Sequence, residues 1–256
     1  MNITKTFLIS AALMMSAGSL SAAGYLQNAN FLTVQLKQHQ NFGPNQIRLQ
    51  IVSDRIIRVQ ATAEQSFRNK QSLIIVPQTS KTNYKVEEQG DHLIITTAAM
   101  RAVLNEATGQ ITFYDLKGNV LLNEVAQGGK TFKPFTVPDR EIGVNIAKVP
   151  EEQKHGWSWH ALFDSPDNEA FYGLGQHQSE ELNMKGKNED LFQYNTKVSV
   201  PFVISNKNYG ILWDSYSYCR WGNPDDYIQL SRAFKPYDKD GTEGPLTGTD
   251  VEKNGP

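Results

Sequence analysis

The chain has 256 residues, of which 39% are hydrophobic and 20% are charged, a composition typical of globular proteins that excludes an intrinsically disordered chain. The formal net charge is −2, so the surface lacks the positive charge needed to neutralise a polyphosphate backbone, and we expect no nucleic acid partner. A single cysteine, Cys219, excludes an intramolecular disulfide and cannot supply a structural zinc cage.

The first 23 residues have the pattern of an export signal. Lys5 precedes an apolar run at residues 7–15, and small residues occupy the expected cleavage positions 21–23. A membrane anchor is the alternative, but it needs about 20 consecutive apolar residues, and serine and glycine interrupt this run from residue 16 onward. We expect a mature protein that begins at Gly24, is periplasmic or extracellular, and has no membrane partner after cleavage.

Short apolar or alternating segments, each bounded by turn-forming residues, follow one another along the rest of the chain. They lie at residues 31–37, 47–51, 56–59, 73–76, 84–86, 92–97, 100–104, 111–114, 120–122, 157–159, 171–174, 198–204 and 209–213. Residues 115–119 have the composition of a hairpin loop, and we expect further loops around Pro134, Pro138 and Pro150.

No window of a dozen residues carries a convincing 3.6-residue apolar period, so the pattern favours strands over helices. We predict an all-β fold, a large antiparallel β-sandwich over residues 24–234. Two smaller β-domains with a boundary near residues 130–138 are the alternative. From residue 235 to residue 256 the chain is polar and turn-forming, which is typical of a solvated tail.

Two glycines among aromatic residues distinguish the segment 171–177, Phe-Tyr-Gly-Leu-Gly-Gln-His. Because glycine has no side chain to hold neighbours apart, this pattern predicts a strand whose backbone lies close to another group. Together with residues 194–196, the pair Pro201–Phe202 and residues 208–214, the segment resembles the N-terminal domain of glycoside hydrolase family 31, most closely its α-xylosidases. The resemblance is strong over residues 171–213 and is only a general strand pattern before them.

The resemblance implies a galactose-mutarotase-like β-sandwich in a longer enzyme, whose (β/α)-barrel carries an aspartate nucleophile and an aspartate acid/base. The Trp-x-Asp-Met nucleophile motif of the barrel is absent from the 256 residues, and a barrel takes about 250 residues of alternating strand and helix. We therefore expect the non-catalytic N-terminal portion of an exported α-glycosidase, of the α-xylosidase or α-glucosidase type. It would have no catalytic residue or cofactor, and its partner would be the missing barrel.

Two acidic pairs, Glu180–Glu181 and Glu189–Asp190, are the local candidates for acid chemistry. A retaining glycosidase needs two carboxyl groups about 5–5.5 Å apart that converge on one carbon, whereas adjacent residues on a strand point to opposite faces. We therefore interpret both pairs as solvated loop charges. The five histidines are scattered and show no metal-ligand spacing, and no histidine–glutamate pair indicates aldose epimerisation.

Substrate contacts are expected in the loop that follows the glycine-containing strand. Many family members have an aromatic-Asn-x-Asp stretch there, and the matching residues are Tyr194, Asn195, Thr196 and Lys197, where lysine replaces the acid and removes an acceptor for a sugar hydroxyl. By this resemblance Tyr194, Asn195 and Thr196, with His177, are predicted to bind substrate in a full-length relative. The ligand would be an α-linked oligosaccharide such as one derived from xyloglucan. A lone histidine is, however, more often a hydrogen-bonded structural group.

Aromatic rings are the other candidates, since the apolar face of a pyranose stacks on a flat ring. The available rings belong to Trp157, Trp159, Phe171, Tyr172, Tyr194, Trp213 and Trp221. Core packing is the default explanation for those in alternating strands. Of these rings, we expect exposure for Tyr194 and Trp221, because turn-forming residues follow each of them.

The tail has a second interpretation, because residues 240–247 resemble the opening of the protective-antigen type of carbohydrate-binding module that interrupts the sandwich in such α-xylosidases. On that view residues 235–256 are the start of a truncated inserted module. Two other functions stay open: a stand-alone secreted carbohydrate-binding domain, and a docking domain without activity. If the barrel is missing, an apolar surface should be left open and favour association.

Overall fold

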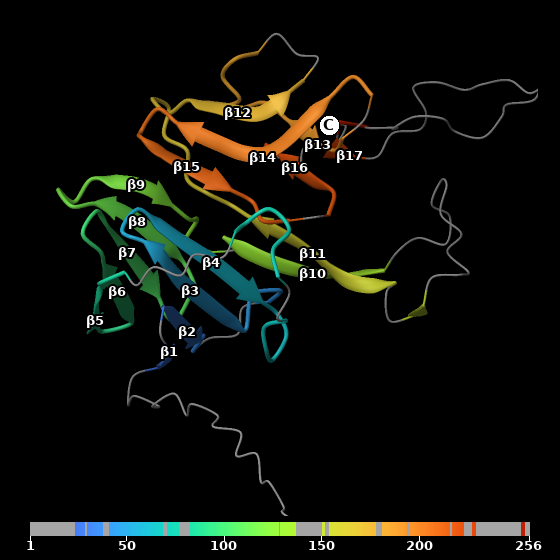
Figure 1. The fold of residues 1–256 in the computed structure, drawn as a ribbon. Coiled ribbons are helices and arrows are strands. Elements are labelled where there is room, and N and C mark those ends of the chain that lie inside the picture. The colour runs from blue at the N-terminus through green and yellow to red at the C-terminus, as the bar shows by residue number, and fades with distance from the viewer. Residues whose placement is uncertain are drawn as a thin grey trace, which may run out of the picture. The chain divides into compact units, whose positions relative to one another are not determined.

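The computed structural model describes residues 24–28, 30–37, 41–68, 71–76, 82–127, 129–136, 150–151, 154–177, 181–193, 195–215, 217–222, 227–228 and 252–253. The predicted export signal, Tyr194 and all of the tail except residues 252–253 lie outside these ranges. Every regular element in the described part is a β-strand, and every strand pair is antiparallel, which confirms the predicted all-β class (Figure 1).

The chain divides into two compact units. The first unit comprises residues 1–70 and 78–164, and the second comprises residues 71–77 and 165–256. A single domain over residues 24–234 stays a prediction, and the two units are therefore described separately.

A four-stranded meander begins the first unit. It consists of β1 (Tyr25–Asn28), β2 (Phe31–Gln35), β3 (Gln46–Ser53) and β4 (Ile56–Thr62), paired in chain order. Alternate residues of β2 and β3 are fully buried, namely Leu32, Val34, Ile47, Leu49 and Ile51. This period of two is the one that the sequence pattern predicts for a strand with one face in the core.

A second, five-stranded meander completes the core of the first unit. It consists of β5 (Lys85–Gln89), β6 (His92–Thr96), β7 (Met100–Asn105), β8 (Ile111–Asp115) and β9 (Val120–Asn123). Its fully buried side chains, Leu93, Ile95, Ala102, Leu104 and Ile111, form one cluster with those of β2 and β3. The first unit is thus a β-sandwich with a single apolar core.

The hairpin between β8 and β9 confirms the loop predicted at residues 115–119. Asp115 Oδ1 accepts hydrogen bonds from the backbone amides of Lys117 at 2.9 Å and Asn119 at 2.8 Å. The other carboxylate oxygen accepts a bond from Asn119 Nδ2 at 2.7 Å. These bonds hold the pKa of Asp115 below its usual value, because they favour the charged form.

A two-stranded ribbon ends the first unit, where β10 (Lys130–Thr136) pairs with β11 (His155–Ala161). The loop predicted around Pro134 is wrong, because Pro134 lies within β10 opposite Trp157. A two-stranded ribbon has an outer edge on each strand, so a proline without an N–H can be accommodated there. The loop predicted around Pro138 falls on residues outside the described ranges, whereas Pro150 is described and belongs to no strand, in agreement with the loop predicted there.

Glu124 and Lys130 form a buried ion pair at the base of this ribbon. Glu124 Oε2 also accepts a hydrogen bond from the Ile111 amide at 2.8 Å, and Lys130 Nζ donates to the Gly109 carbonyl at 3.1 Å. Burial raises the pKa of Glu124 and lowers the pKa of Lys130, and their mutual attraction opposes both shifts. No sequence pattern indicated this pair.

The second unit contains the glycine-containing strand. Its main sheet has the order β12 (Phe171–Gln176), β14 (Val198–Ser205) and β15 (Tyr209–Leu212), and β13 (Glu189–Leu191) pairs with β16 (Cys219–Trp221). A further short pair joins β17 (Tyr227–Ile228) to β18 (Glu252–Lys253). Phe171, Leu174, Met184 and Val203 form the buried core of this unit.

The strand predicted at residues 73–76 is wrong. Ser72 Oγ accepts hydrogen bonds from the amides of Ile74 at 3.2 Å and Ile75 at 2.9 Å, which curl the segment into a turn. Leu73 and Val76 are largely exposed, so their apolar run does not reflect burial.

Within the described ranges, no helix has the length and apolar character that crossing a membrane requires.

Candidate functional site

The close approach predicted for the glycine-containing strand is made to the neighbouring strand β14. Gly173 and Gly175 have φ angles of 133° and 99°, and the register between β12 and β14 shifts between them. A Cβ on Gly173 would lie 2.5 Å from the Phe202 carbonyl oxygen, and one on Gly175 would lie 2.0 Å from the Val198 carbonyl oxygen. No other residue type fits either position without moving the backbone.

Leu174, between the two glycines, adopts a φ of 67° and is fully buried. The left-handed conformation is uncommon for a residue with a Cβ, so the bulge places the backbone of Leu174 in an unusual orientation. One consequence is a hydrogen bond between the Leu174 carbonyl and His177 Nε2 at 2.7 Å. This bond fixes the imidazole at the end of β12.

The other side of the His177 ring faces Glu189. The distance from Nδ1 to Glu189 Oε2 is 2.9 Å, and Nδ1 forms no hydrogen bond to any residue that the structure describes. The same oxygen accepts a hydrogen bond from Lys197 Nζ at 3.0 Å. The three side chains are 5%, 14% and 7% exposed, in the order His177, Glu189 and Lys197.

This cluster corrects the interpretation of Glu189 as a solvated loop charge. Glu189 is enclosed and paired, whereas its neighbour Asp190 is more exposed and accepts a hydrogen bond from the hydroxyl of Tyr218 at 2.6 Å. The two adjacent acids of β13 therefore have separate partners, as expected for a strand. Glu181 is exposed and pairs with Lys187, in agreement with its predicted surface position, and Glu180 lies outside the described residues.

The predicted substrate-binding residues occupy different environments. Asn195 and Thr196 are exposed in the turn between β13 and β14, and the next residue, Lys197, is turned inward to Glu189. Lys197 is therefore in a buried ion pair rather than at the surface position from which an acid would contact a sugar hydroxyl. His177 lies beneath the surface.

Two further hydrogen bonds stabilise the base of this turn. Ser199 donates its amide to Gln193 Oε1 at 3.0 Å, and its hydroxyl donates to the Phe192 carbonyl at 3.1 Å. These bonds join the end of β13 to the start of β14. With the Glu189–Lys197 pair, they hold the backbone on both sides of the exposed residues.

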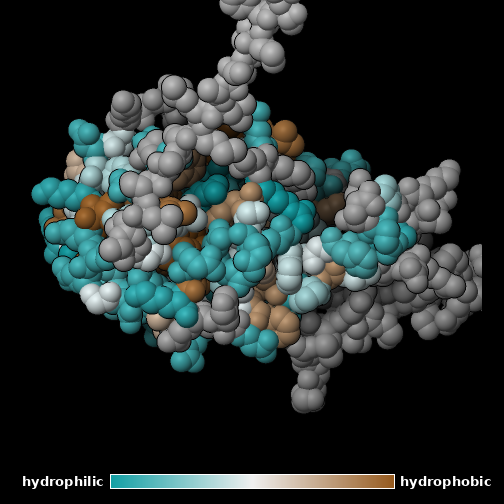
Figure 2. Space-filling model, turned by 90° about the horizontal axis from the view of Figure 1, so that it is seen from below, coloured by the Kyte–Doolittle hydropathy of each residue, from teal (hydrophilic) through white to brown (hydrophobic). Residues whose placement is uncertain are grey.

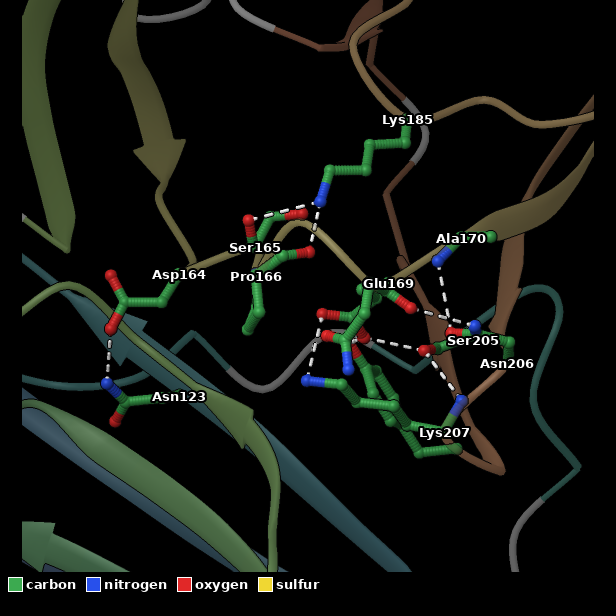
Figure 3. A network of polar contacts seen from close by, with 12 residues as sticks. Asn123, Asp164, Ser165, Pro166, Glu169, Ala170, Lys185, Ser205, Asn206 and Lys207 are labelled. Carbon is green, nitrogen blue, oxygen red and sulfur yellow. Dashed lines mark hydrogen bonds and ion pairs between the residues drawn. The ribbon is translucent and has the colours of Figure 1, made fainter.

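A second buried carboxylate, Glu169, lies just before β12, at the opposite end of that strand from His177 (Figure 3). Its Oε1 accepts hydrogen bonds from the hydroxyls of Ser205 at 2.5 Å and Tyr209 at 2.6 Å, and Lys207 Nζ lies 3.6 Å from Oε2. Burial, and then the bond to Glu169, raise the pKa of Tyr209 well above its ordinary value. Glu169 is 1% exposed and fully engaged, so it is a structural group.

Backbone bonds surround this carboxylate in Figure 3. Asn206 Oδ1 accepts a bond from the Ala170 amide at 3.0 Å, and Asn206 Nδ2 donates to the Asn168 carbonyl at 3.1 Å. Lys185 Nζ donates to the carbonyls of Ser165 and Pro166. The network connects the segment before β12 to the β14–β15 turn. Sequence reasoning did not find it, because its members are far apart in the chain.

The prediction that the Trp221 ring is exposed is wrong. Trp221 packs edge-on against Phe171 and Trp213, with ring centroids 5.3 Å and 5.6 Å apart, and its Nε1 donates to the Met184 carbonyl at 2.9 Å. The indole is part of the core of the second unit. Trp157 and Trp159, expected in the core, are 42% and 41% exposed on one face of β11.

The main sheet of the second unit is apolar on its outer face as well. Exposed side chains come from every second residue of β14 and from their neighbours on β12 and β15, namely Val198, Val200, Phe202, Ile204, Tyr172 and Leu212. An apolar outer face on β14 agrees with the predicted open apolar surface.

The surface that Figure 2 shows from below is mostly hydrophilic, with hydrophobic residues scattered over it.

Comparison with known proteins identifies the family. The model of the glycosyl hydrolase 31 N-terminal galactose mutarotase-like domain matches residues 46–221. The chain belongs to this family. An α-xylosidase of Saccharolobus solfataricus is 26% identical over 181 residues, which are 67% of this chain and 22% of that protein. The chain thus spans about a fifth of the length of this relative.

Two solved structures are similar in sequence and fold. The family 31 α-xylosidase of Xanthomonas citri is 36% identical with a TM-score of 0.68, covering 85% of this chain and 22% of that one. A family 31 α-xylosidase from a soil metagenome, solved with xylose, is 25% identical with a TM-score of 0.58, covering 77% of this chain and 29% of that one. The predicted membership of family 31, with α-xylosidases as similar proteins, is confirmed.

Proposed function

We propose that this chain is the non-catalytic N-terminal portion of an exported α-glycosidase of the α-xylosidase type, and that it shapes part of the sugar pocket of that enzyme outside the cytoplasm. The 36% identity to an α-xylosidase over 85% of the chain supports the enzyme class. The observation that carries the role in sugar recognition is the exposed pair Asn195 and Thr196, held between two fixed strands.

The chemistry of this turn suits a saccharide. The Asn195 amide offers donors and an acceptor, and the Thr196 hydroxyl offers one of each, which are the groups that sugar hydroxyls bind. Tyr194 would add a ring on which the apolar face of a pyranose can stack. Because Lys197 is paired inside with Glu189, its ammonium is not among the groups that this turn offers to the ligand. We propose an α-linked oligosaccharide, such as one derived from xyloglucan, as the ligand.

Calorimetry with xyloglucan oligosaccharides tests this proposal. Asn195→Ala and Tyr194→Ala should each weaken or abolish the heat of binding of the full chain, because each removes a contact group. Thr108→Ala, which alters a turn in the first unit, is the matched control and should bind like the unaltered chain. Binding that is equal in all of these proteins would refute the role of the turn.

Docking without sugar binding is a second candidate, and one observation favours it. The outer face of the β12–β14–β15 sheet exposes six apolar side chains, an arrangement typical of a sheet that another layer covers. The partner would be a barrel of the same enzyme family. If oligosaccharides produce no heat of binding with the chain while a separately produced family 31 barrel binds it, docking describes the function better than sugar recognition does.

A further inference from the structure

The buried cluster of His177, Glu189 and Lys197 joins three separate segments of the second unit. His177 follows the last residue of β12, Glu189 is the first residue of β13, and Lys197 immediately precedes β14. Glu189 Oε2 is the common atom, 2.9 Å from His177 Nδ1 and 3.0 Å from Lys197 Nζ. The 19 residues between His177 and Lys197 therefore begin and end at one carboxylate.

We propose that Glu189 is a positioning residue for sugar recognition: by pairing with Lys197, next to His177, it fixes the turn that presents Asn195 and Thr196. This inference rests on the proposed function for its link to sugar. The physical reason for this effect on the turn is the direction in which the Lys197 side chain points. Because Lys197 is turned inward to Glu189, the two residues immediately before it are kept at the surface. The contacts of Ser199 with Gln193 and Phe192 limit motion on the other side.

Loss of the Glu189 charge should release this turn. Glu189→Gln leaves the Lys197 ammonium without its carboxylate at a site where its side chain is 7% exposed. Loss of the carboxylate that compensates a buried charge is strongly unfavourable, so the lysine moves toward water and shifts the adjoining backbone. The double variant Glu189→Gln/Lys197→Met removes both charges and should restore much of the order, since replacing a buried pair by uncharged groups is often nearly neutral.

Glu169 supplies a matched control in the same unit. It is also a buried carboxylate paired with a lysine, but its partners are Ser205, Tyr209 and Lys207 at the β14–β15 turn. Glu169→Gln should lower thermal stability, as Glu189→Gln does, because each change weakens a buried polar network. Only Glu189→Gln should alter the turn at residues 193–199. A merely structural role for Glu189 would give the two variants the same behaviour.

The experiment measures amide hydrogen exchange and sugar affinity on the full chain. In Glu189→Gln, exchange over residues 193–199 should accelerate at least about tenfold, and the affinity for a xyloglucan oligosaccharide should fall about tenfold. Glu169→Gln should leave both unchanged, and Glu189→Gln/Lys197→Met should recover most of both. If Glu189→Gln does not fold, Lys197→Met can be used instead. It removes the ammonium group that pairs with Glu189 and should also accelerate exchange over residues 193–199.

The outcomes separate this inference from the proposed function. If exchange at residues 193–199 is unchanged in Glu189→Gln and Lys197→Met, or rises equally in Glu169→Gln, the positioning role is overturned, whatever the sugar affinities of these variants are. If exchange responds as expected but the unaltered chain binds no oligosaccharide, Glu189 orders the turn and the proposed sugar contact fails. If the exchange responds and affinity is the same in all variants, the link between Glu189 and recognition is overturned.

Discussion

Single glycines determine how closely β12 and β14 can approach. The sequence indicated a close contact at residues 173 and 175 but could not name the partner, because composition carries no information on which strand lies beside which. The structure assigns the contact to the carbonyls of Phe202 and Val198. Glycine is needed there both for its positive φ and for the missing Cβ.

We predict that Gly175→Ala destabilises the second unit more than Gly186→Ala does. Both glycines have a positive φ, 99° and 68°, but only at Gly175 would a Cβ meet another atom, whereas nothing lies within 4 Å of one at Gly186. The strain common to both is about 1–2 kcal/mol, and the clash should add about 1–3 kcal/mol at Gly175. Denaturant unfolding measures the difference, and equal losses would contradict the close approach.

Tyr209 should make stability depend on alkaline pH. Its pKa is raised from the ordinary value of 10.0 by burial and by the bond to Glu169, so the folded state favours the neutral phenol. This stabilisation is fully present below pH 10, the unfolded value, and is lost as the pH rises above it toward the higher folded value. Unfolding free energy should therefore fall between about pH 10 and 12, and fall less steeply in Tyr209→Phe. Parallel pH profiles for the two proteins would refute this.

Among the elements, local patterns predicted the strands whose signals lie in their own residues. The alternation in β3 and the turn chemistry of residues 115–119 both gave correct elements, because each depends on neighbours in sequence. The two errors have different causes. Pro134 is tolerated in β10 because that strand belongs to a two-stranded ribbon, a pairing that local sequence does not specify. Residues 73–76 form no strand because the neighbouring Ser72 binds their amides, a local turn that the apolar pattern concealed.

The β8–β9 hairpin should depend on one carboxylate. Asp115→Ala removes the acceptor for the amides of Lys117 and Asn119 and should lower the midpoint of denaturation of the first unit. Asp115→Asn keeps Oδ1 as an acceptor and should lose less stability, which makes it the matched control. Thermal unfolding followed by circular dichroism measures both. A larger loss in Asp115→Asn than in Asp115→Ala would contradict the assignment of these bonds.

At the scale of the molecule, the sequence predicted the family, whereas the predicted substrate contacts stay predictions. The motifs at residues 171–177 and 194–196 indicated the family and singled out His177. The cluster of His177, Glu189 and Lys197 could not be predicted, since it depends on how three strand ends meet. Trp221 was placed at the surface because a turn follows it, whereas the packing against Phe171 and Trp213 decides its position.

The outer face of the main sheet should drive association of the isolated chain. Phe202→Thr/Ile204→Thr replaces two exposed apolar side chains on β14 by ones with similar strand preference, and should reduce both light scattering and binding of a dye for apolar surfaces. Leu73→Ser changes a side chain that is 81% exposed in the second unit but belongs to no strand of this sheet, and should change little. The same dye binding in both variants would show that the face is not the cause.

The central claim is that this β-fold recognises a saccharide but does not hydrolyse it. The most direct measurement combines two assays on one preparation of the full chain, calorimetry with a xyloglucan oligosaccharide and release of the aryl group from an aryl α-xyloside. The account predicts heat of binding that depends on Asn195, without aryl release. Aryl release that is lost in Glu169→Gln or Glu189→Gln would contradict the claim, because a carboxylate of this chain would then carry the chemistry.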